Sequence, residues 1–197
     1  EMKGDASYML IEYMNHMITS MLNTRLEDMS SKPDAPFAAA GVSDGEFFIA
    51  STKDAFSVSA VAKDTDIKPV VEALYREVLR AQRGGFTATE YARARAEYIS
   101  RLEKAYKNRA SRESGSYARE YASHFTSNEP IPGIEWEYQT MNMIVNQIPV
   151  EGINQIFTQY ITPDNRVLLA LFPEKEGVVL PTETELAQVI AAVDAET

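Results

Sequence analysis

Two histidines, His16 and His124, are the only imidazoles that this 197-residue chain offers for catalysis or metal binding. A zinc site on a helix normally places a second ligand three or four residues from the first. Glu12 precedes His16 by four residues, and Glu120 precedes His124 by four, so each histidine has one carboxylate neighbour. One imidazole and one carboxylate do not complete a zinc site, and nothing in the sequence brings the two histidines together. We therefore expect structural or surface roles for both, and no metal ligand in the chain.

Other patterns associated with catalysis are weak. The chain has no cysteine, which excludes thiolate zinc sites and cysteine nucleophiles. It contains neither a Gly-x-Ser-x-Gly elbow nor a phosphate-binding loop. Gly84-Gly85 lacks the lysine and spacing of such a loop and is typical of a helix end. Glu135 and Glu137 flank Trp136 and could act as the acid and base of a glycosidase, but exposed glutamates beside an aromatic residue are common. We expect no catalytic and no cofactor-binding residue.

One segment differs from the rest of this acidic chain in its charge. The whole chain has a net charge of −10, whereas residues 93–119 hold eight basic and three acidic residues, a net charge of +5. The basic residues of this segment are Arg93, Arg95, Arg101, Lys104, Lys107, Arg109, Arg112 and Arg119. One interpretation is a solvated helical face with pairs such as Glu97–Arg101 and Glu103–Lys107. The other is a basic wall that faces a partner domain or an acidic ligand.

Length and overall charge limit the classes of function. A chain of 197 residues can bury a full hydrophobic core and forms one domain or two small ones. Its acidity argues against a nucleic-acid partner and against docking on an anionic membrane. No apolar run approaches the roughly 20 residues that span a bilayer, so we expect no membrane insertion.

Hydrophobic spacing predicts helices and strands that cluster separately along the chain. Helices are predicted over residues 5–29, 67–83, 87–112, 113–125, 135–146, 151–160 and within 181–197. Strands are predicted over residues 37–42 and 46–51, which flank the turn-forming Ser43-Asp44-Gly45, and over residues 55–63 and 166–172. The last run is apolar on both faces, which is typical of an interior strand. This order predicts an α+β fold, a two-layer sandwich of a mainly antiparallel or mixed sheet with helices packed on one face.

The strongest local signal is the start of the helix predicted from residue 87. Thr87 and Glu90 have the spacing of a capping box, and Phe86 and Tyr91 have the spacing of a hydrophobic staple. The sequence therefore fixes this helix start more firmly than any other element boundary.

An ordered set of short segments resembles one family. The set comprises Met21–Leu26 at the end of the first helix, Ala35–Phe37, the helix start Gly85–Glu90, Ser123–Phe125, Glu129–Ile134 and Glu135–Tyr138. In this order and spacing, over roughly residues 5–173, the chain resembles the second, non-catalytic domain of the pitrilysin/insulinase zinc peptidases. It is most similar to the N-terminal half of the bacterial "probable zinc protease" branch.

The resemblance implies zinc chemistry in the parent protein and none in this segment. In such proteins the first domain carries an inverted motif, His-x-x-Glu-His, whose histidines bind zinc and whose glutamate activates water. This sequence has no such motif. The implied role is a domain that forms a chamber around a peptide substrate. Its implied partners are the preceding catalytic domain and the second half of the same chain.

The resemblance also divides the chain and suggests a compartment. Residues 1–175 correspond to the non-catalytic domain, and residues 176–197 to the start of the linker between the halves. Similar bacterial proteases are exported, which favours the periplasm or cell envelope. Two alternatives stay open: a scaffold or partner subunit from a catalytically dead family member, and a stand-alone ligand-binding domain unrelated to peptidases.

Overall fold

The computed structural model describes residues 6–47, 50–174 and 176–196, and it confirms the α+β fold. The elements are α1 (Ala6–Ser30), β1 (Phe37–Phe47), β2 (Ala50–Ala62), α2 (Lys68–Gly84), α3 (Ala88–Lys107), α4 (Ser114–Ser127), α5 (Ile134–Ile144), α6 (Val150–Phe157) and α7 (Glu183–Asp194). Single 3₁₀ turns, Arg109–Ser111 and Val145–Gln147, follow α3 and α5. None of the helices in the described part of the chain is both long and apolar enough to cross a bilayer.

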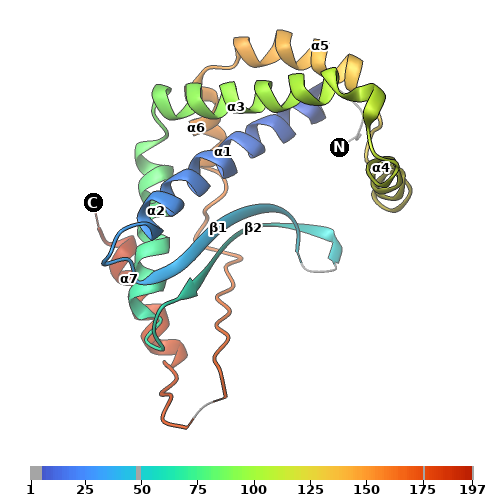
Figure 1. Ribbon diagram of the computed structural model, residues 1–197. Coiled ribbons are helices and arrows are strands. Elements are labelled where there is room, and N and C mark those ends of the chain that lie inside the picture. The colour runs from blue at the N-terminus through green and yellow to red at the C-terminus, as the bar shows by residue number, and fades with distance from the viewer. Residues whose placement is uncertain (1–5, 48–49, 175, 197) are drawn as a thin grey trace.

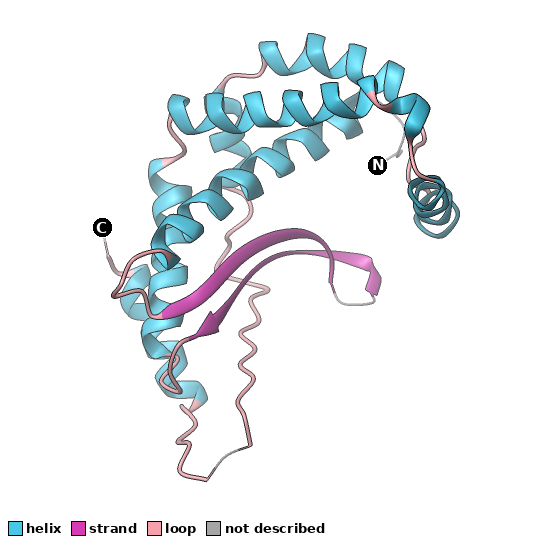
Figure 2. Ribbon diagram, in the orientation of Figure 1, coloured by secondary structure: helices cyan, strands magenta, loops and turns pink. Residues whose placement is uncertain are grey.

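Helix α1 forms the centre of the molecule. Figure 1 shows it between α3 on one side and the β1–β2 hairpin on the other, and Figure 2 shows the hairpin as a layer separate from the helices. The apolar residues Met17, Ile18, Leu22 and Leu26 of α1 are completely buried. A helix covered on several sides needs apolar residues around much of its circumference, as this one has.

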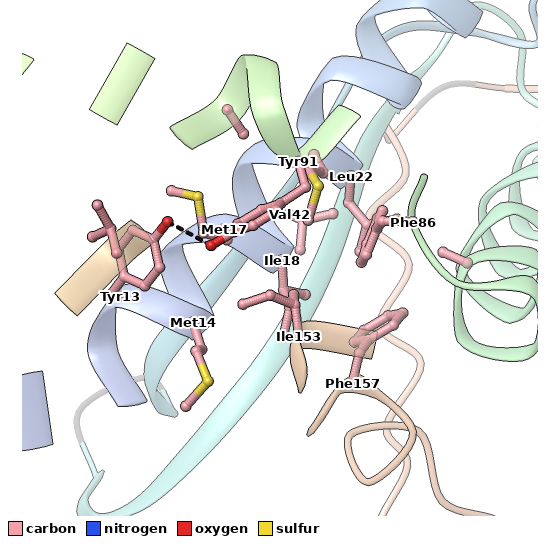
Figure 3. Packing of buried hydrophobic residues seen from close by; sticks show 14 of the residues in the cluster. Tyr13, Met14, Met17, Ile18, Leu22, Val42, Phe86, Tyr91, Ile153 and Phe157 are labelled. Carbon is pink, nitrogen blue, oxygen red and sulfur yellow. Dashed lines mark hydrogen bonds between the residues drawn. The ribbon is translucent and has the colours of Figure 1, made fainter. Parts of the chain in front are cut away.

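The core joins α1 to the short helix α6 and to the start of α3. Ile153 and Phe157 of α6 lie beside Ile18 and Phe86 (Figure 3). The hydroxyl oxygens of Tyr13 and Tyr91 lie 3.0 Å apart and share a hydrogen bond. Burial, reinforced by this bond, raises the pKa of Tyr13, so the phenol stays neutral. Buried tyrosine hydroxyls need such a partner.

The described sheet has two antiparallel strands, β1 and β2. The turn predicted at Ser43-Asp44-Gly45 is wrong, because these residues lie inside β1 and pair with Ser57, Phe56 and Ala55. The run predicted as a separate strand over residues 46–51 divides between the two strands, and the connection at residues 48–49 lies outside the described residues. The longer ladder satisfies more backbone groups than an early turn would. In β2, Phe56 and Val58 pack on the core, whereas Ser57 and Ser59 are exposed.

The strand predicted over residues 166–172 is also wrong for this structure. The segment is extended but has no strand neighbour among the described residues, and most of its side chains are exposed. An apolar run becomes a strand only where another strand offers backbone partners.

The helix start at Thr87 is confirmed as a capping box. The Thr87 hydroxyl accepts a hydrogen bond from the Glu90 backbone N–H, and a Glu90 carboxylate oxygen accepts one from the Thr87 N–H. Phe86 and Tyr91 are buried at the staple positions. The helix ends at Lys107 rather than near Arg112, because residues 109–111 form a 3₁₀ turn and Arg112 has an extended backbone.

Helix α7 lies against α2. Tyr75 donates a hydrogen bond of 2.6 Å to Asp194, the Arg76 guanidinium binds the Glu196 carboxylate, and Lys68 lies 3.3 Å from Glu185. The predicted boundary between domain and linker falls at residue 175, which lies outside the described residues, and it stays a prediction.

Gly85 lies at the junction between α2 and α3, where its conformation and surroundings favour glycine. Gly84-Gly85 ends α2 as predicted, and Gly85 has φ +73° with a backbone N–H that donates to Ala81. A Cβ on Gly85 would lie 2.6 Å from the Asn154 side-chain nitrogen, and Asn154 is hydrogen-bonded to both backbone groups of Phe86. We expect Gly85→Ala to lower the free energy of unfolding by about 1–3 kcal/mol, measured by urea denaturation.

The neighbouring glycine gives a matched control. A Cβ on Gly84 would meet no atom within 4 Å. Gly84 also belongs to α2, so Gly84→Ala is expected to be neutral or to stabilise the protein by up to about 1 kcal/mol. Equal stability of the two alanine variants would contradict the requirement for glycine at position 85.

Candidate functional site

His16 lies on α1 and faces an arginine of α3. Arg101 Nη2 donates a hydrogen bond of 2.6 Å to His16 Nε2, and the His16 ring lies near that of Tyr98. Burial lowers the pKa of His16, and the guanidinium of Arg101 lowers it further. The imidazole is therefore neutral at pH 7, and the cation at its Nε2 occupies the position that a metal ion would need.

His124 lies on α4 in a different setting. Its Nδ1 is 2.6 Å from the Glu129 carbonyl oxygen in the loop after α4. A carbonyl oxygen only accepts hydrogen bonds, so Nδ1 carries the hydrogen and donates the bond. Its expected neighbour Glu120 instead pairs with Arg112 at 2.7 Å. The two histidines thus lie on different helices, and His16 pairs with Arg101 of α3 whereas His124 pairs with the loop after α4. Within the described residues no three His, Asp or Glu side chains gather in a way that could hold a metal ion.

The two glutamates beside Trp136 do not form an acid–base pair. Glu135 binds Arg109 on the chain leading out of α3, with an Nε–Oε1 distance of 2.9 Å. Burial raises the pKa of Glu137, and nearby Glu120 raises it further. Residues two apart on a helix do not face each other, so one substrate could not lie between these carboxylates.

The basic segment is largely paired within the chain. Lys107 binds Glu103 at 2.6 Å as predicted, whereas Arg101 turns to His16 instead of forming the predicted pair with Glu97. Arg109 also lies over the ring of Tyr106, with 4.3 Å between the guanidinium carbon and the ring centre. These contacts favour the interpretation as a solvated helical face with local ion pairs.

A polar cluster centres on Arg25, for which the sequence predicted no role. Arg25 Nε lies 2.5 Å from Glu90 Oε1, and its Nη1 lies 3.2 Å from Glu77 Oε1. Its Nη2 donates to the Gly85 carbonyl oxygen, and the guanidinium lies over the Phe86 ring. We call Arg25, Glu77 and Glu90 the Arg25 cluster. It joins α1, α2 and the start of α3, so its role is to position helices.

A sequence signal for this cluster exists. Arg25 lies at the edge of the apolar stripe of α1, next to the completely buried Leu22 and Leu26. A charge at the edge of an apolar stripe is stable only when it is paired. The sequence could therefore have indicated a partner for Arg25, although it could not have identified Glu77 and Glu90, because they lie 52 and 65 residues away.

The Arg25 cluster predicts a specific loss of stability in acid. The hydrogen bond from Arg25 lowers the pKa of Glu90 from its ordinary 4.5 to about 2. A carboxyl group whose pKa is lower in the folded state stabilises that state above about pH 4.5, and the stabilisation is lost as the pH falls toward 2. We expect this group to contribute about 2 kcal/mol at pH 7, less than the full shift implies because Glu90 is partly exposed.

The measurement is the free energy of unfolding between pH 2 and pH 7 for the wild type and Glu90→Gln. Glutamine keeps the capping-box geometry without the charge, so the variant should show a shallower pH dependence. Glu185→Gln is the matched control, because Glu185 caps α7 in the same way but its ion pair is with the exposed Lys68. A control that flattened the pH dependence as much as Glu90→Gln would contradict the assignment to the Arg25 cluster.

Comparison with known proteins relates the chain to proteases. No protein-family model matches it. A "Zinc protease PQQL-like" protein of Arabidopsis thaliana is 29% identical over 102 residues, which make up 52% of this chain and 11% of that protein. The sequence relationship therefore rests on about half of the chain.

Three solved protease structures share the fold. The periplasmic protease PqqL from Escherichia coli matches 98% of this chain and 21% of its own, with a TM-score of 0.78 and 16% identity. The first half of PqqL, solved separately, matches 79% of this chain and 33% of its own, with a TM-score of 0.69 and 21% identity. A predicted insulinase-family protease from Yersinia pestis matches 97% and 40%, with a TM-score of 0.81 and 10% identity.

This chain therefore spans only a part of each relative, from 11% of the Arabidopsis protein to 40% of the Yersinia chain. At these identities the solved structures establish the fold, and the match to the zinc protease adds a relationship by sequence.

Proposed function

Because the chain belongs to the pitrilysin/insulinase family of zinc proteases, we propose that it is a non-catalytic domain of a bacterial zinc metalloendopeptidase. In this role it forms part of the wall of a chamber that encloses a peptide substrate, and it supports the catalytic domain. The observation that carries the proposal is the match of nearly the whole chain to a minor part of a larger protease. The chain itself is a peptidase-family domain.

The residues of this chain do not fit the zinc of the family. The resemblance implies a His-x-x-Glu-His motif, but His16 is followed by Met17-Ile18-Thr19 and His124 by Phe125-Thr126-Ser127. The guanidinium of Arg101 lies against the imidazole of His16 and would repel a metal ion there. We therefore assign no step of peptide hydrolysis to this chain and place the zinc of the parent protein in the preceding domain.

The proposed partners are the preceding catalytic domain and the second half of the same protein. The contribution of this chain is a rigid frame, because the Arg25 cluster and the capping box fix the directions of α1, α2 and α3 relative to one another. A compartment in the periplasm or cell envelope is part of the proposal, and it is supported by the periplasmic location of the Escherichia coli relative.

The test is to assay the 197-residue chain alone for zinc binding and proteolysis. We expect titration calorimetry to show no stoichiometric binding of zinc, and we expect no cleavage of unfolded β-casein that 1,10-phenanthroline inhibits. The complete gene product should cleave casein under the same conditions. Stoichiometric zinc binding or chelator-sensitive cleavage by the chain alone would overturn the non-catalytic role.

The sequence of the complete gene product distinguishes an active protease from the alternative, a scaffold. A His-x-x-Glu-His motif upstream of residue 1 is the expected result. Its absence from the complete gene product would contradict the proposed protease and would favour a scaffold or partner subunit from a catalytically dead family member.

A further inference from the structure

Helix α4 is set apart from the rest of the fold. Figure 1 shows it beyond the ends of α3 and α5, seen almost along its axis. None of its residues is buried, whereas each of the other α-helices has at least one buried residue. A helix that buries no apolar side chain gains little stability from packing. Its position therefore depends on its polar contacts.

The backbone at both ends of α4 has conformations suited to a hinge. Arg112 and Glu113, which precede the helix, are extended after the 3₁₀ turn. Asn128, which follows it, has a left-handed backbone with φ 54°, and Gly133, before α5, has φ 78°. A hinge consists of a few residues at the ends of an element that absorb changes in φ and ψ. The helix can therefore swing as a unit about these two connections.

Polar contacts hold α4 in its docked position. Arg112 Nη1 lies 2.7 Å from Glu120 Oε2, and the Arg112 guanidinium carbon lies 4.4 Å from the centre of the Tyr117 ring. In the loop after the helix, Tyr8 of α1 donates a hydrogen bond of 2.9 Å to a Glu129 carboxylate oxygen. Partly exposed ion pairs contribute little free energy each, so a modest change of charge can shift the helix.

A carboxylate of α5 faces this ion pair. Glu137 is half-buried, and it interacts with Glu120 of α4, with Arg112 and with Tyr98 of α3. Among the described residues, no side-chain hydrogen bond or ion pair satisfies Glu137. Burial raises the pKa of Glu137 and nearby Glu120 raises it further, whereas Arg112 lowers it. The pKa of Tyr98 is raised to about 12, so this phenol stays neutral.

The charge of Glu137 is thereby linked to the position of α4. A carboxylate ionises more readily where water surrounds it and no other carboxylate is close. When α4 swings away, it takes Glu120 with it and admits water to Glu137. The docked position therefore binds more protons than the open position and is favoured at low pH. As the pH rises above the ordinary range of a glutamate, the open position gains population.

We propose that α4 is a hinged, pH-sensitive helix, which is docked when Glu137 is protonated and released when Glu137 ionises beside Glu120. The helix carries a stripe of aromatic side chains spaced four residues apart, Tyr117, Tyr121 and Phe125, and Phe125 is 88% exposed. Release of α4 thus changes the aromatic surface that the domain presents. This movement is a property of the chain itself and does not depend on whether the parent protein is a protease.

The distance between two spin labels, measured by double electron–electron resonance, tests the movement. The chain has no cysteine, so Ser100→Cys on α3 and Ser123→Cys on α4 place one label at each of two exposed positions. We expect one main distance at pH 5. At pH 8 the fraction of molecules at other distances should be at least fivefold larger. A distance distribution that is the same at both pH values would overturn the proposal.

A pair of variants of the labelled chain tests the role of Glu137. Glu137→Gln keeps the size of the side chain without its charge, so α4 should stay docked at both pH values. Glu135→Gln is the matched control, because Glu135 lies two residues earlier on α5 and pairs with Arg109. This control should keep the pH dependence of the wild type. Equal pH dependence in the two variants would contradict the role of Glu137.

His124 is another group on α4 that can respond to pH, because histidine ordinarily changes its charge between pH 5 and pH 8. Its Nδ1 donates to the Glu129 carbonyl oxygen in the loop after the helix. The labelled His124→Gln variant should release α4 at pH 8 as the wild type does. Loss of the pH dependence in this variant would assign the movement to His124 and overturn the proposal.

Hydrogen exchange gives a second measurement, which needs no label and no substitution. A released helix of 14 residues is only marginally stable, so its amides become accessible to water. After correction for the intrinsic effect of pH, the amides of α4 should exchange at least tenfold faster at pH 8 than at pH 5. Those in the buried part of α1 should change less than threefold. Equal corrected rates for α4 at the two pH values would overturn the proposal.

Discussion

Replacement of Arg25 by alanine is expected to lower the free energy of unfolding by about 3 kcal/mol. The side chain is 13% exposed and interacts with Glu90, Glu77 and the Gly85 carbonyl oxygen. Breaking a buried ion pair by removing one partner typically costs 3–5 kcal/mol, because the other charge is left uncompensated. We expect the lower end of this range because Arg80 still binds Glu77, with an Nη2–Oε1 distance of 2.8 Å.

The measurement is urea denaturation at pH 7 followed by circular dichroism, with Arg93→Ala as the matched control. Arg93 is an exposed arginine of α3, and its replacement should change the stability by less than about 0.5 kcal/mol. A double-mutant cycle of Arg25→Ala with Glu90→Gln should show a coupling energy above 1 kcal/mol, since both residues act through the same hydrogen bonds. Strict additivity of the two substitutions would contradict the cluster.

The helices could be predicted from the sequence because their signals are local. The apolar spacing of α1 repeats along a helix of 25 residues, and the capping box needs only Thr87 and Glu90, three residues apart. Each signal lies within a short window of the sequence, so it does not depend on residues far away in the chain. The end of α3 was predicted at residue 112 but lies at Lys107, because a 3₁₀ turn and an α-helix share much of the same residue preference.

The strands could not be predicted equally well because each depends on a partner. Ser43-Asp44-Gly45 has turn residues, yet pairing with residues 55–57 of β2 keeps it in β1. Residues 166–172 have the composition of an interior strand, but no strand in the described part of the chain pairs with them. A short window of sequence shows the propensity of a segment to form a strand, but it does not show whether a partner strand lies beside it.

The polar contacts of the site were the least predictable. His16 has Glu12 as its nearest carboxylate along α1, yet its partner is Arg101, which lies 85 residues later. The residues of the Arg25 cluster are separated by similarly long stretches. The sequence indicated which residues could do chemistry. The packing of α1 against α2 and α3 determines which of them meet.

Replacement of Phe157 by alanine is expected to have the largest effect of all, a loss of about 4 kcal/mol of stability. Phe157 is completely buried, and its ring centre lies 5.6 Å from those of Phe56 and Phe86 and 5.9 Å from that of Tyr160. It therefore joins β2 and the start of α3 to α6. Truncation of a buried phenylalanine to alanine typically costs 3–5 kcal/mol, because it removes contacts and leaves a cavity.

The position of Phe157 in a short helix makes this effect more severe. Helix α6 has eight residues, and a helix of this length is stable only through its packing. Loss of the ring should also loosen Asn154, which holds the backbone of Phe86 from the same helix. Hydrogen exchange should therefore speed up in α6 and at the start of α3 together. Phe125→Ala is the control, because Phe125 is 88% exposed and its loss should change the stability by less than about 0.5 kcal/mol. If the two variants were equally stable, α6 would not be the element that joins the sheet to the helices.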